Sequence, residues 1–200
     1  MSLRTHIILV TGVAFSVIVI FLPTFGLFGR SSSVESAFLV SGVQTLQKTT
    51  GLPIRLVIPE IGVDAAIESV GLTTSGAMDA PKDPADTGWF NLGPRPGESG
   101  SAIIDGHFGW KNNTPAVFDK LSTLQSGDKI YVEDEKGVMT TFVVRKLQIY
   151  GENANASDVF SSSDGKSHLN LITCGGSLDA TSKSYSDRLV VFADNDTEPL

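Results

Sequence analysis

The chain has 200 residues, 41% of them hydrophobic, and a formal net charge of −7 at pH 7. This length fits one domain of ordinary size together with a short additional segment. After Arg30, thirteen basic residues stand against twenty-two acidic ones, a net charge of about −9, and this balance argues against nucleic acid as a partner. One cysteine and scattered histidines cannot complete a zinc site, so no metal site is predicted.

The N-terminal segment, residues 1–30, is predicted to cross a membrane. Between Arg4 and Arg30, twenty-two residues from Ile7 to Phe28 carry no charge, which is long enough for a membrane-spanning helix. No clear A-x-A cleavage pattern follows Phe28, so we predict an uncleaved signal-anchor with a short tail inside the cell and the domain outside. A cleaved signal peptide and a buried core helix are the alternatives.

The rest of the chain divides into a stalk and a β-rich domain. Residues 31–50 are rich in Ser, Thr and Gln, and we interpret them as a stalk. In residues 51–200, short apolar runs alternate with Gly, Pro, Asn and Asp, which is typical of strands joined by frequent turns. The predicted strands are Ile54–Ile58, Ala66–Val70, Ser101–Ile104, Lys129–Glu133, Thr140–Tyr150, Leu169–Thr173 and Leu189–Ala193. Helical turns are predicted at Pro115–Leu121 and Ala156–Ser161, and a hairpin turn at Asp134-Glu135-Lys136-Gly137. The fold class is therefore mainly all-β, a barrel or a sandwich.

Cys174 is the first candidate for a functional residue. It follows the apolar run Leu171-Ile172-Thr173 and precedes two glycines, which predicts a thiol at the end of a buried strand. A lone cysteine in an exported domain needs a chemical reason, because extracellular thiols are normally oxidised or absent. A partly accessible thiol near a base or a cation would be a nucleophile. A buried structural cysteine is the alternative.

Two other residues supply a base and a cation. His107 follows the strand Ser101–Ile104 and the turn Asp105-Gly106, and imidazole titrates in the range that acid–base catalysis needs. Arg188 begins the strand Leu189–Ala193, and its guanidinium would lie close to Cys174 if these two strands are neighbours. Taken alone, His107 could equally be a hydrogen-bonded loop residue without a catalytic role. Arg188 taken alone could equally be a surface residue that forms an ion pair. The other histidines, His6 and His168, are interpreted as having no catalytic role.

The combination resembles the sortases, the membrane-anchored cysteine transpeptidases of Gram-positive-type bacteria. Their motif T-L-x-T-C appears here as Asn170-Leu171-Ile172-Thr173-Cys174, with a Gly-His turn before it and a strand that opens with Arg after it. The resemblance covers roughly residues 51–194. Asn170 stands where the motif has threonine, so the subclass is not assigned; this position is expected to support the strand rather than to react.

The resemblance implies a closed eight-stranded sortase-type β-barrel with short helices, preceded by the transmembrane helix. It implies that Cys174 is the nucleophile, His107 the general acid and base, and Arg188 the residue that stabilises the oxyanion and the substrate. Thr173 and Ile172 would line the substrate groove. The implied partners are surface proteins with an LPXTG-like sorting signal and an amine acceptor on peptidoglycan or a pilin. The protein would be a single-pass protein of the cell membrane with its catalytic domain extracellular.

Two other functions stay open at this point. One is a membrane-anchored cysteine peptidase that uses water as the acceptor, and the other is a non-catalytic β-barrel that binds peptide. No cofactor is predicted, although calcium modulation stays open. Acidic residues lie in predicted loops, but their spacing matches no EF-hand loop. They are Glu133, Asp134, Glu135, Glu152 and Asp158.

Overall fold

The computed structural model describes residues 50–109, 114–151, 154–179 and 184–196. All of them belong to one compact unit of the chain, Leu46–Leu200. The predicted membrane segment and nearly all of the predicted stalk lie outside the described residues. Among the described residues, no helix has the length and apolar character needed to cross a membrane.

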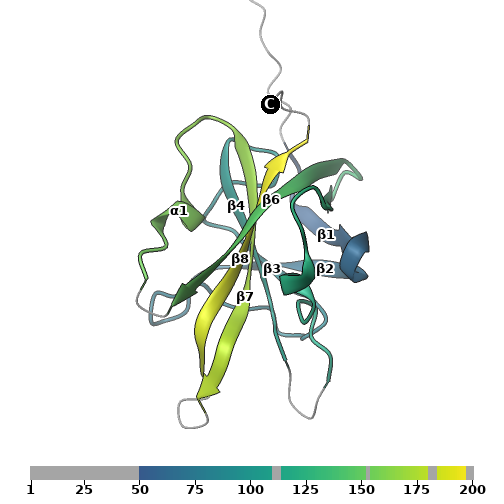
Figure 1. The fold of residues 1–200 in the computed structure, drawn as a ribbon. Coiled ribbons are helices and arrows are strands. Elements are labelled where there is room, and N and C mark those ends of the chain that lie inside the picture. The colour runs from purple at the N-terminus through teal and green to yellow at the C-terminus, as the bar shows by residue number, and fades with distance from the viewer. Residues whose placement is uncertain (1–49, 110–113, 152–153, 180–183, 197–200) are drawn as a thin grey trace, which may run out of the picture. The chain divides into compact units, whose positions relative to one another are not determined.

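Eight strands close into a barrel. Figure 1 shows β7 and β8 side by side, with α1 beside the barrel. The strands are β1 (Pro53–Ile58), β2 (Val63–Val70), β3 (Thr87–Phe90), β4 (Gly100–Gly106), β5 (Lys129–Asp134), β6 (Met139–Gly151), β7 (Ser167–Asp179) and β8 (Ser184–Asn195). The helical elements are η1 (Pro59–Ile61), η3 (Leu121–Thr123) and α1 (Ser157–Phe160). Around the barrel the order is β1-β2-β3-β4-β7-β8-β6-β5, with β5 pairing β1. The prediction of a closed eight-stranded, mainly β barrel is confirmed, since the order of paired strands returns from β5 to β1.

Strand alternation places one set of side chains inside the barrel and the other on its outer surface. On β4, Ala102 and Ile104 belong to the interior core, whereas Ile103 between them belongs to a second cluster with Val159 of α1. β7 alternates in the same way, with Leu169 and Leu171 inside. The outer face of β4, β7 and β8 is therefore covered by apolar contacts around α1, and this face carries the candidate site.

β7 and β8 differ from their predicted extents. β7 does not end at Thr173 but continues to Asp179, and β8 begins at Ser184 rather than at Leu189. The two glycines after Cys174 do not end the strand, because the ladder continues across a register shift between Gly175 and Leu178. Gly176 takes a φ of +76°, which favours glycine. Cys174 and Arg188 thus lie within strands, not at their ends.

Two other elements also differ from the sequence prediction. β3 was not predicted, and it pairs in parallel with β2 and antiparallel with β4. The predicted helical segment Pro115–Leu121 forms turns that lead into the 3-10 helix η3. The predicted helical turn at Ala156–Ser161 is confirmed as α1. The hairpin turn between β5 and β6 is confirmed as well.

Asp134 at this hairpin shows why one predicted loop acid is structural. Its carboxylate accepts hydrogen bonds from the backbone N–H groups of Gly51, Lys136 and Val138 at 2.8, 2.9 and 2.9 Å. Burial acts to raise the pKa of Asp134, but these three donors outweigh it and lower that pKa. Asp134 therefore holds the start of the domain against the β5–β6 turn.

Candidate active site

Cys174 and Arg188 face each other directly across two neighbouring strands. They are register partners in the antiparallel ladder of β7 and β8. Directly opposed residues carry their side chains on the same face, with Cβ atoms about 4.5–5.5 Å apart. The condition stated for Arg188, that its strand neighbours the cysteine strand, is therefore met. The side chains that carry the Cys174 thiol and the permanently charged Arg188 guanidinium therefore extend from adjacent positions on one face of the sheet.

His107 follows the strand on the other side of β7 from Arg188. β4 pairs in parallel with β7, and Asp105 is the register partner of Ile172. His107 follows Asp105 by two residues, as Cys174 follows Ile172, so a ladder extended by two residues would bring the histidine opposite the cysteine. Cys174 and Arg188 lie on the neighbouring strands β7 and β8, and His107 directly follows the end of β4, the other neighbour of β7.

The His107 ring is held by a defined contact. Its Nε2 lies 2.8 Å from the carbonyl oxygen of Pro81. Because a carbonyl only accepts hydrogen bonds, Nε2 carries the proton in this contact. The next residue, Phe108, packs edge to face against Tyr185 of β8, with ring centroids 5.6 Å apart. The histidine segment is therefore tied to the strand that carries Arg188.

Gly106 precedes the histidine at a position where any side chain would crowd its neighbours. A Cβ here would lie 2.6 Å from the Phe118 ring and 2.7 Å from Val117. Its carbonyl oxygen accepts a hydrogen bond of 2.7 Å from the Thr173 hydroxyl. Close packing and this bond join β4 to β7 immediately beside His107 and Cys174.

Thr173 therefore has a different place from the one expected. Its side chain is 3% exposed and turned to the face opposite Cys174, with its hydroxyl on the backbone of β4. It does not line the pocket next to Arg188, whereas Ile172 does. Thr173 joins two strands rather than forming a groove wall, because alternation gives adjacent residues opposite faces.

The pocket next to Arg188 has a volume of about 350 Å³ and mainly apolar walls. Its lining includes Met78, Asp105, Tyr150, Val159, Phe160, Ile172, Arg188 and Val190. Tyr150 donates a hydrogen bond of 2.7 Å to Asp158 of α1, and burial together with this carboxylate raises the pKa of Tyr150 to about 12. The Asn170 side-chain amide donates a hydrogen bond of 2.6 Å to the Val159 carbonyl oxygen. Both bonds fix α1 as the pocket wall, so Asn170 supports structure, as expected.

Arg188 lies at the exposed end of this pocket. Its Nη1 donates to the carbonyl oxygens of Tyr185 and Asp187, at 3.0 and 2.9 Å. These contacts restrain the guanidinium close to its own strand. A guanidinium has five N–H donors, and the hydrogen bonds that Arg188 makes to described residues use only Nη1.

Asp105 was missed as a site residue, because the sequence suggested only a turn before His107. It lies in β4 and lines the pocket beside Ile172 and Arg188. Burial, and then the nearby Asp79, raise the pKa of Asp105 to about 7, against the opposing effect of its own backbone N–H. The sequence feature that could have identified Asp105 is an acidic residue directly after the apolar run Ala102–Ile104.

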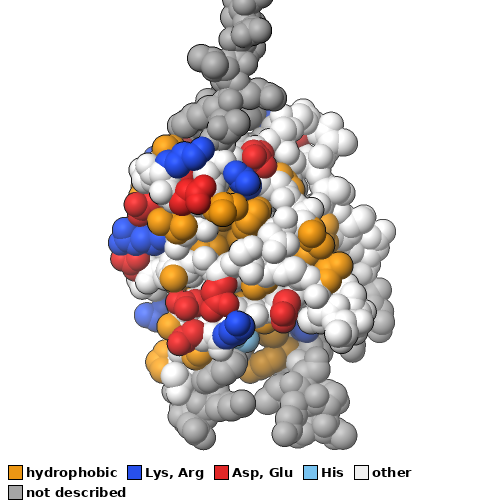
Figure 2. Space-filling view, turned by 180° about the vertical axis from the view of Figure 1, so that it is seen from behind, with side chains coloured by type: hydrophobic (Ala, Val, Ile, Leu, Met, Phe, Trp, Pro, Cys, Tyr) orange, Lys and Arg blue, Asp and Glu red, His pale blue; other side chains and the backbone are white. Residues whose placement is uncertain are grey.

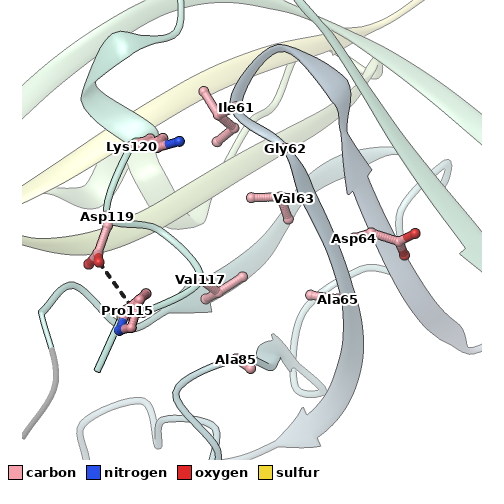
Figure 3. A pocket seen from close by; sticks show the side chains of 11 residues that line it. Ile61, Gly62, Val63, Asp64, Ala65, Ala85, Pro115, Val117, Asp119 and Lys120 are labelled. Atoms are coloured by element: carbon pink, nitrogen blue, oxygen red, sulfur yellow. Dashed lines mark hydrogen bonds between the residues drawn. The ribbon is translucent and has the colours of Figure 1, made fainter. Parts of the chain in front are cut away.

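A second pocket, of about 300 Å³, lies between β2 and residues 115–120 (Figure 3). Figure 3 shows Val63 and Val117 on its walls, and Asp119 turned toward the Pro115 segment. Asp119 accepts hydrogen bonds from the backbone N–H groups of Gly109 and Ala116. Because its carboxylate is engaged in this way and none of the three predicted catalytic residues lines the pocket, we place the site at the Arg188 pocket instead.

His168 has the structural place that the sequence suggested, although it is more buried than a loop residue. Its Nδ1 lies 2.8 Å from an Asp194 carboxylate oxygen and its Nε2 lies 3.0 Å from one of Asp164, so it ties the start of β7 to β8.

Within the described ranges, no group of three or more His, Cys, Asp or Glu side chains is arranged to hold a metal ion. On the face seen in Figure 2, acidic and basic side chains lie intermingled.

Comparison with known proteins agrees with this architecture. A family model described as Sortase domain matches residues 56–196. The chain is similar to sortase C-1 from Actinomyces oris at 25% identity, over 74% of this chain and 76% of that one, with a TM-score of 0.57. The lid mutant of sortase A from Corynebacterium diphtheriae shares 24% identity, over 76% and 75% of the two chains, with a TM-score of 0.56, a likeness of fold. No curated protein matches significantly. Because this domain match covers well over half of the chain, from within β1 to the end of β8, the chain belongs to the sortase family.

Proposed function

We propose that this sortase cleaves an LPXTG-like sorting signal through a thioester on Cys174 and transfers the acyl group to an amine acceptor. Family membership gives the general activity, that of a cysteine transpeptidase. The observation that carries the specific proposal is the direct register of Cys174 with Arg188, together with His107 at the end of the adjoining strand. Of these three residues Arg188 lines the apolar pocket, and Cys174 lies two residues along β7 from Ile172, which also lines it.

The first half-reaction forms the acyl-enzyme. The Cys174 thiolate attacks the carbonyl carbon between Thr and Gly of the sorting signal, and Arg188 donates hydrogen bonds to the oxyanion that develops. The carbon–nitrogen bond then breaks, and protonated His107 gives its proton to the departing amine. The products are a thioester on Cys174 and a free amino group on the released peptide.

The second half-reaction transfers the acyl group. An amine attacks the thioester carbonyl, a carbon–nitrogen bond forms, and the carbon–sulfur bond breaks to return the thiolate. His107 accepts the proton that the attacking amine loses, so the thiolate and the imidazolium are both restored. The contact between Nε2 and the Pro81 carbonyl holds the imidazole ring in one orientation.

The pocket supports a role in holding the acyl part of the signal. The acyl part stays attached during both half-reactions, whereas the amine must leave and be replaced. The apolar walls that include Ile172 and Val190 begin two residues along the strands from Cys174 and Arg188. We infer that Ile172 contacts the signal, and that Thr173 positions the cysteine strand through its bond to Gly106.

The cellular setting is part of the same proposal. A charge-free segment of twenty-two residues near the N-terminus supports a membrane anchor, with the barrel on the outer side of the membrane. Surface proteins that carry a sorting signal would be the donors. An amine of peptidoglycan or of a pilin would be the acceptor.

Intact-mass spectrometry of the full chain in detergent, incubated with LPXTG-type peptides, tests the nucleophile. Wild type should gain the mass of the acyl part, and Cys174→Ala should not. Arg188→Lys keeps the charge but loses the forked geometry, so acylation should slow by about 100-fold or more. Arg145→Lys, an exposed ion-pair residue on β6, is the matched control and should acylate normally. A Cys174→Ala variant that still cleaves the peptide would refute the assignment.

Adding an oligoglycine or a diamino acid separates the transferase from a peptidase. A transpeptidase should give the amide product in place of the free acid as the amine concentration rises. Free acid alone at every amine concentration would favour water as the acceptor. A thiol that resists alkylation in the folded protein would favour a non-catalytic binder, but Cys174 is only half-buried.

A further inference from the structure

His107 lies just beyond the part of β4 that strand pairing holds in place. The pairing of β4 with β7 ends at Asp105 and Ile172, and β4 itself ends at Gly106. Interstrand hydrogen bonds fix the backbone only as far as a ladder extends. The position of the histidine backbone therefore depends on contacts outside the sheet.

Residues 115–120 supply such contacts on both sides of the histidine. The Phe118 N–H donates a hydrogen bond of 3.0 Å to the His107 carbonyl oxygen. Two residues after the histidine, the Gly109 N–H donates one of 2.8 Å to Oδ1 of Asp119. The first contact uses backbone atoms alone, whereas the second depends on the side chain of Asp119.

The second oxygen of the Asp119 carboxylate binds within its own turn. Its Oδ2 accepts a hydrogen bond of 3.0 Å from the Ala116 N–H (Figure 3). One carboxylate thus uses both oxygens to hold Gly109 and Ala116 together. Asparagine could not replace it in full, because its side chain has a single acceptor oxygen.

A second turn of the same kind shows which of these bonds is special to Asp119. Asp128 donates its N–H to the Gln125 carbonyl and accepts the Gln125 N–H, as Asp119 does with Ala116. Such turn contacts are common for aspartate. The bond to Gly109 is additional, and it joins the turn to the segment that carries the histidine.

The same residues 115–120 also reach the segment that orients the imidazole ring. The ring is held through Nε2 by the Pro81 carbonyl oxygen. Three residues further along the chain, the Pro84 carbonyl oxygen accepts a hydrogen bond of 2.8 Å from the Val117 N–H. The turn that Asp119 closes is therefore bonded both to the backbone around His107 and to the segment that holds its ring.

We propose that Asp119 is a positioning residue for His107 in the transpeptidase reaction. This inference rests on the proposed function, in which His107 gives its proton to the departing amine. Asp119 acts through the backbone at Gly109, and without its carboxylate the histidine segment loses one of its ties. A displacement of about 1 Å in a catalytic group can cost about 100-fold in rate.

The test varies the leaving group of the sorting peptide. One LPXTG-type peptide has the normal amide between Thr and Gly, and its analogue has a thioester in place of that bond. An amine must be protonated to leave, whereas a thiol with a pKa of about 8.5 leaves as its thiolate. Both peptides place the same acyl group on Cys174, so intact-mass spectrometry measures both rates. A misplaced His107 should slow mainly the amide reaction, but a general loss of structure should slow both.

The proteins are the full chain in detergent as wild type, Asp119→Ala, Asp119→Asn, His107→Ala and Asp128→Ala. Asp128→Ala is the matched control, because it removes the same local turn contact without a bond to the histidine segment. Asp119→Asn keeps the size of the side chain and one acceptor oxygen, so it carries the test if the alanine variant does not fold.

Asp119→Ala should slow thioester formation from the amide peptide by about tenfold or more, and from the thioester analogue by less than about threefold. Asp119→Asn should show the same pattern with a smaller loss, and Asp128→Ala should react like wild type. Equal slowing of both peptides by the Asp119 variants would overturn the inference. A normal rate with the amide peptide, or the same selective loss in Asp128→Ala, would overturn it too.

His107→Ala separates the two proposals. It should show the selective loss with the amide peptide more strongly than Asp119→Ala. If His107→Ala shows this selective loss and the Asp119 variants do not, only the role of Asp119 is refuted. If His107→Ala slows both peptides equally, or if wild type forms no thioester, the proposed reaction is refuted and the role of Asp119 with it.

Discussion

Replacing Asp105 with asparagine should remove a pH-dependent loss of stability. In the folded barrel, burial and then Asp79 raise the pKa of this carboxyl group to about 7, from an ordinary value of 3.8. Between these values the folded state binds more protons than the unfolded state, so the free energy of unfolding falls as the pH rises. The penalty is absent below the lower pKa and complete above the higher one.

The size of this effect follows from the two pKa values. Each unit of pKa difference between the folded and unfolded states corresponds to about 1.4 kcal/mol, so the interval from 3.8 to about 7 corresponds to about 4 kcal/mol. Small domains unfold with about 5–15 kcal/mol, so this is a large fraction of their stability. Asparagine has nearly the same shape as aspartate but does not titrate. The unfolding free energy of Asp105→Asn should therefore not show this decrease as the pH rises.

Urea unfolding of residues 46–200 at a series of pH values from about 4 to 8 measures the effect. The fluorescence of Trp89 is a suitable signal, because this side chain is 4% exposed and its Nε1 donates to the Pro94 carbonyl at 3.1 Å. Glu60→Gln is the matched control, since it removes one carboxylate from an exposed position. The difference between wild type and Asp105→Asn should change by about 4 kcal/mol across the series.

A constant difference would refute the reasoning. If the unfolding free energies of wild type and Asp105→Asn run parallel within about 1 kcal/mol over this pH range, the carboxyl group is solvated or paired in solution.

Three further substitutions test the packing around the site. Gly106→Ala should cost about 1–3 kcal/mol and slow acylation, because its Cβ would press on the Phe118 ring; thermal unfolding and the mass assay measure both. Phe142→Ala should cost about 3–5 kcal/mol in urea unfolding, because the side chain is fully buried in the barrel. His168→Leu should cost about 1 kcal/mol and speed protease cleavage within residues 161–166, because the tie to two aspartates is lost.

Each of these has an outcome that would contradict it. Normal acylation by Gly106→Ala would mean that the contact does not position His107. Ile149→Ala, at a side chain that is 68% exposed, is the control for Phe142→Ala and should change stability by less than about 0.5 kcal/mol. An unchanged cleavage rate in His168→Leu would show that other contacts hold the segment.

Local patterns in the sequence were sufficient for most of the barrel. Alternating apolar residues in Leu169–Thr173, and turn residues such as Gly137, act over a few neighbours and can be recognised without a structure. The short β3 was missed because it has four residues, one of them Gly88, and carries no alternation. Its pairing depends on β2 and β4, which lie apart in the chain.

The sequence by itself determined which residues are chemically suited to the site: one thiol, a histidine after a strand, and an arginine in the last strand. Only the tertiary structure decided that Cys174 and Arg188 are register partners, because hydrogen bonds between strands set the register. It also decided that β7 continues past Gly175-Gly176, since pairing with β8 outweighs the local tendency of glycine to end a strand. The burial of Asp105 depends on what packs over it from β3, and no local pattern contains that information.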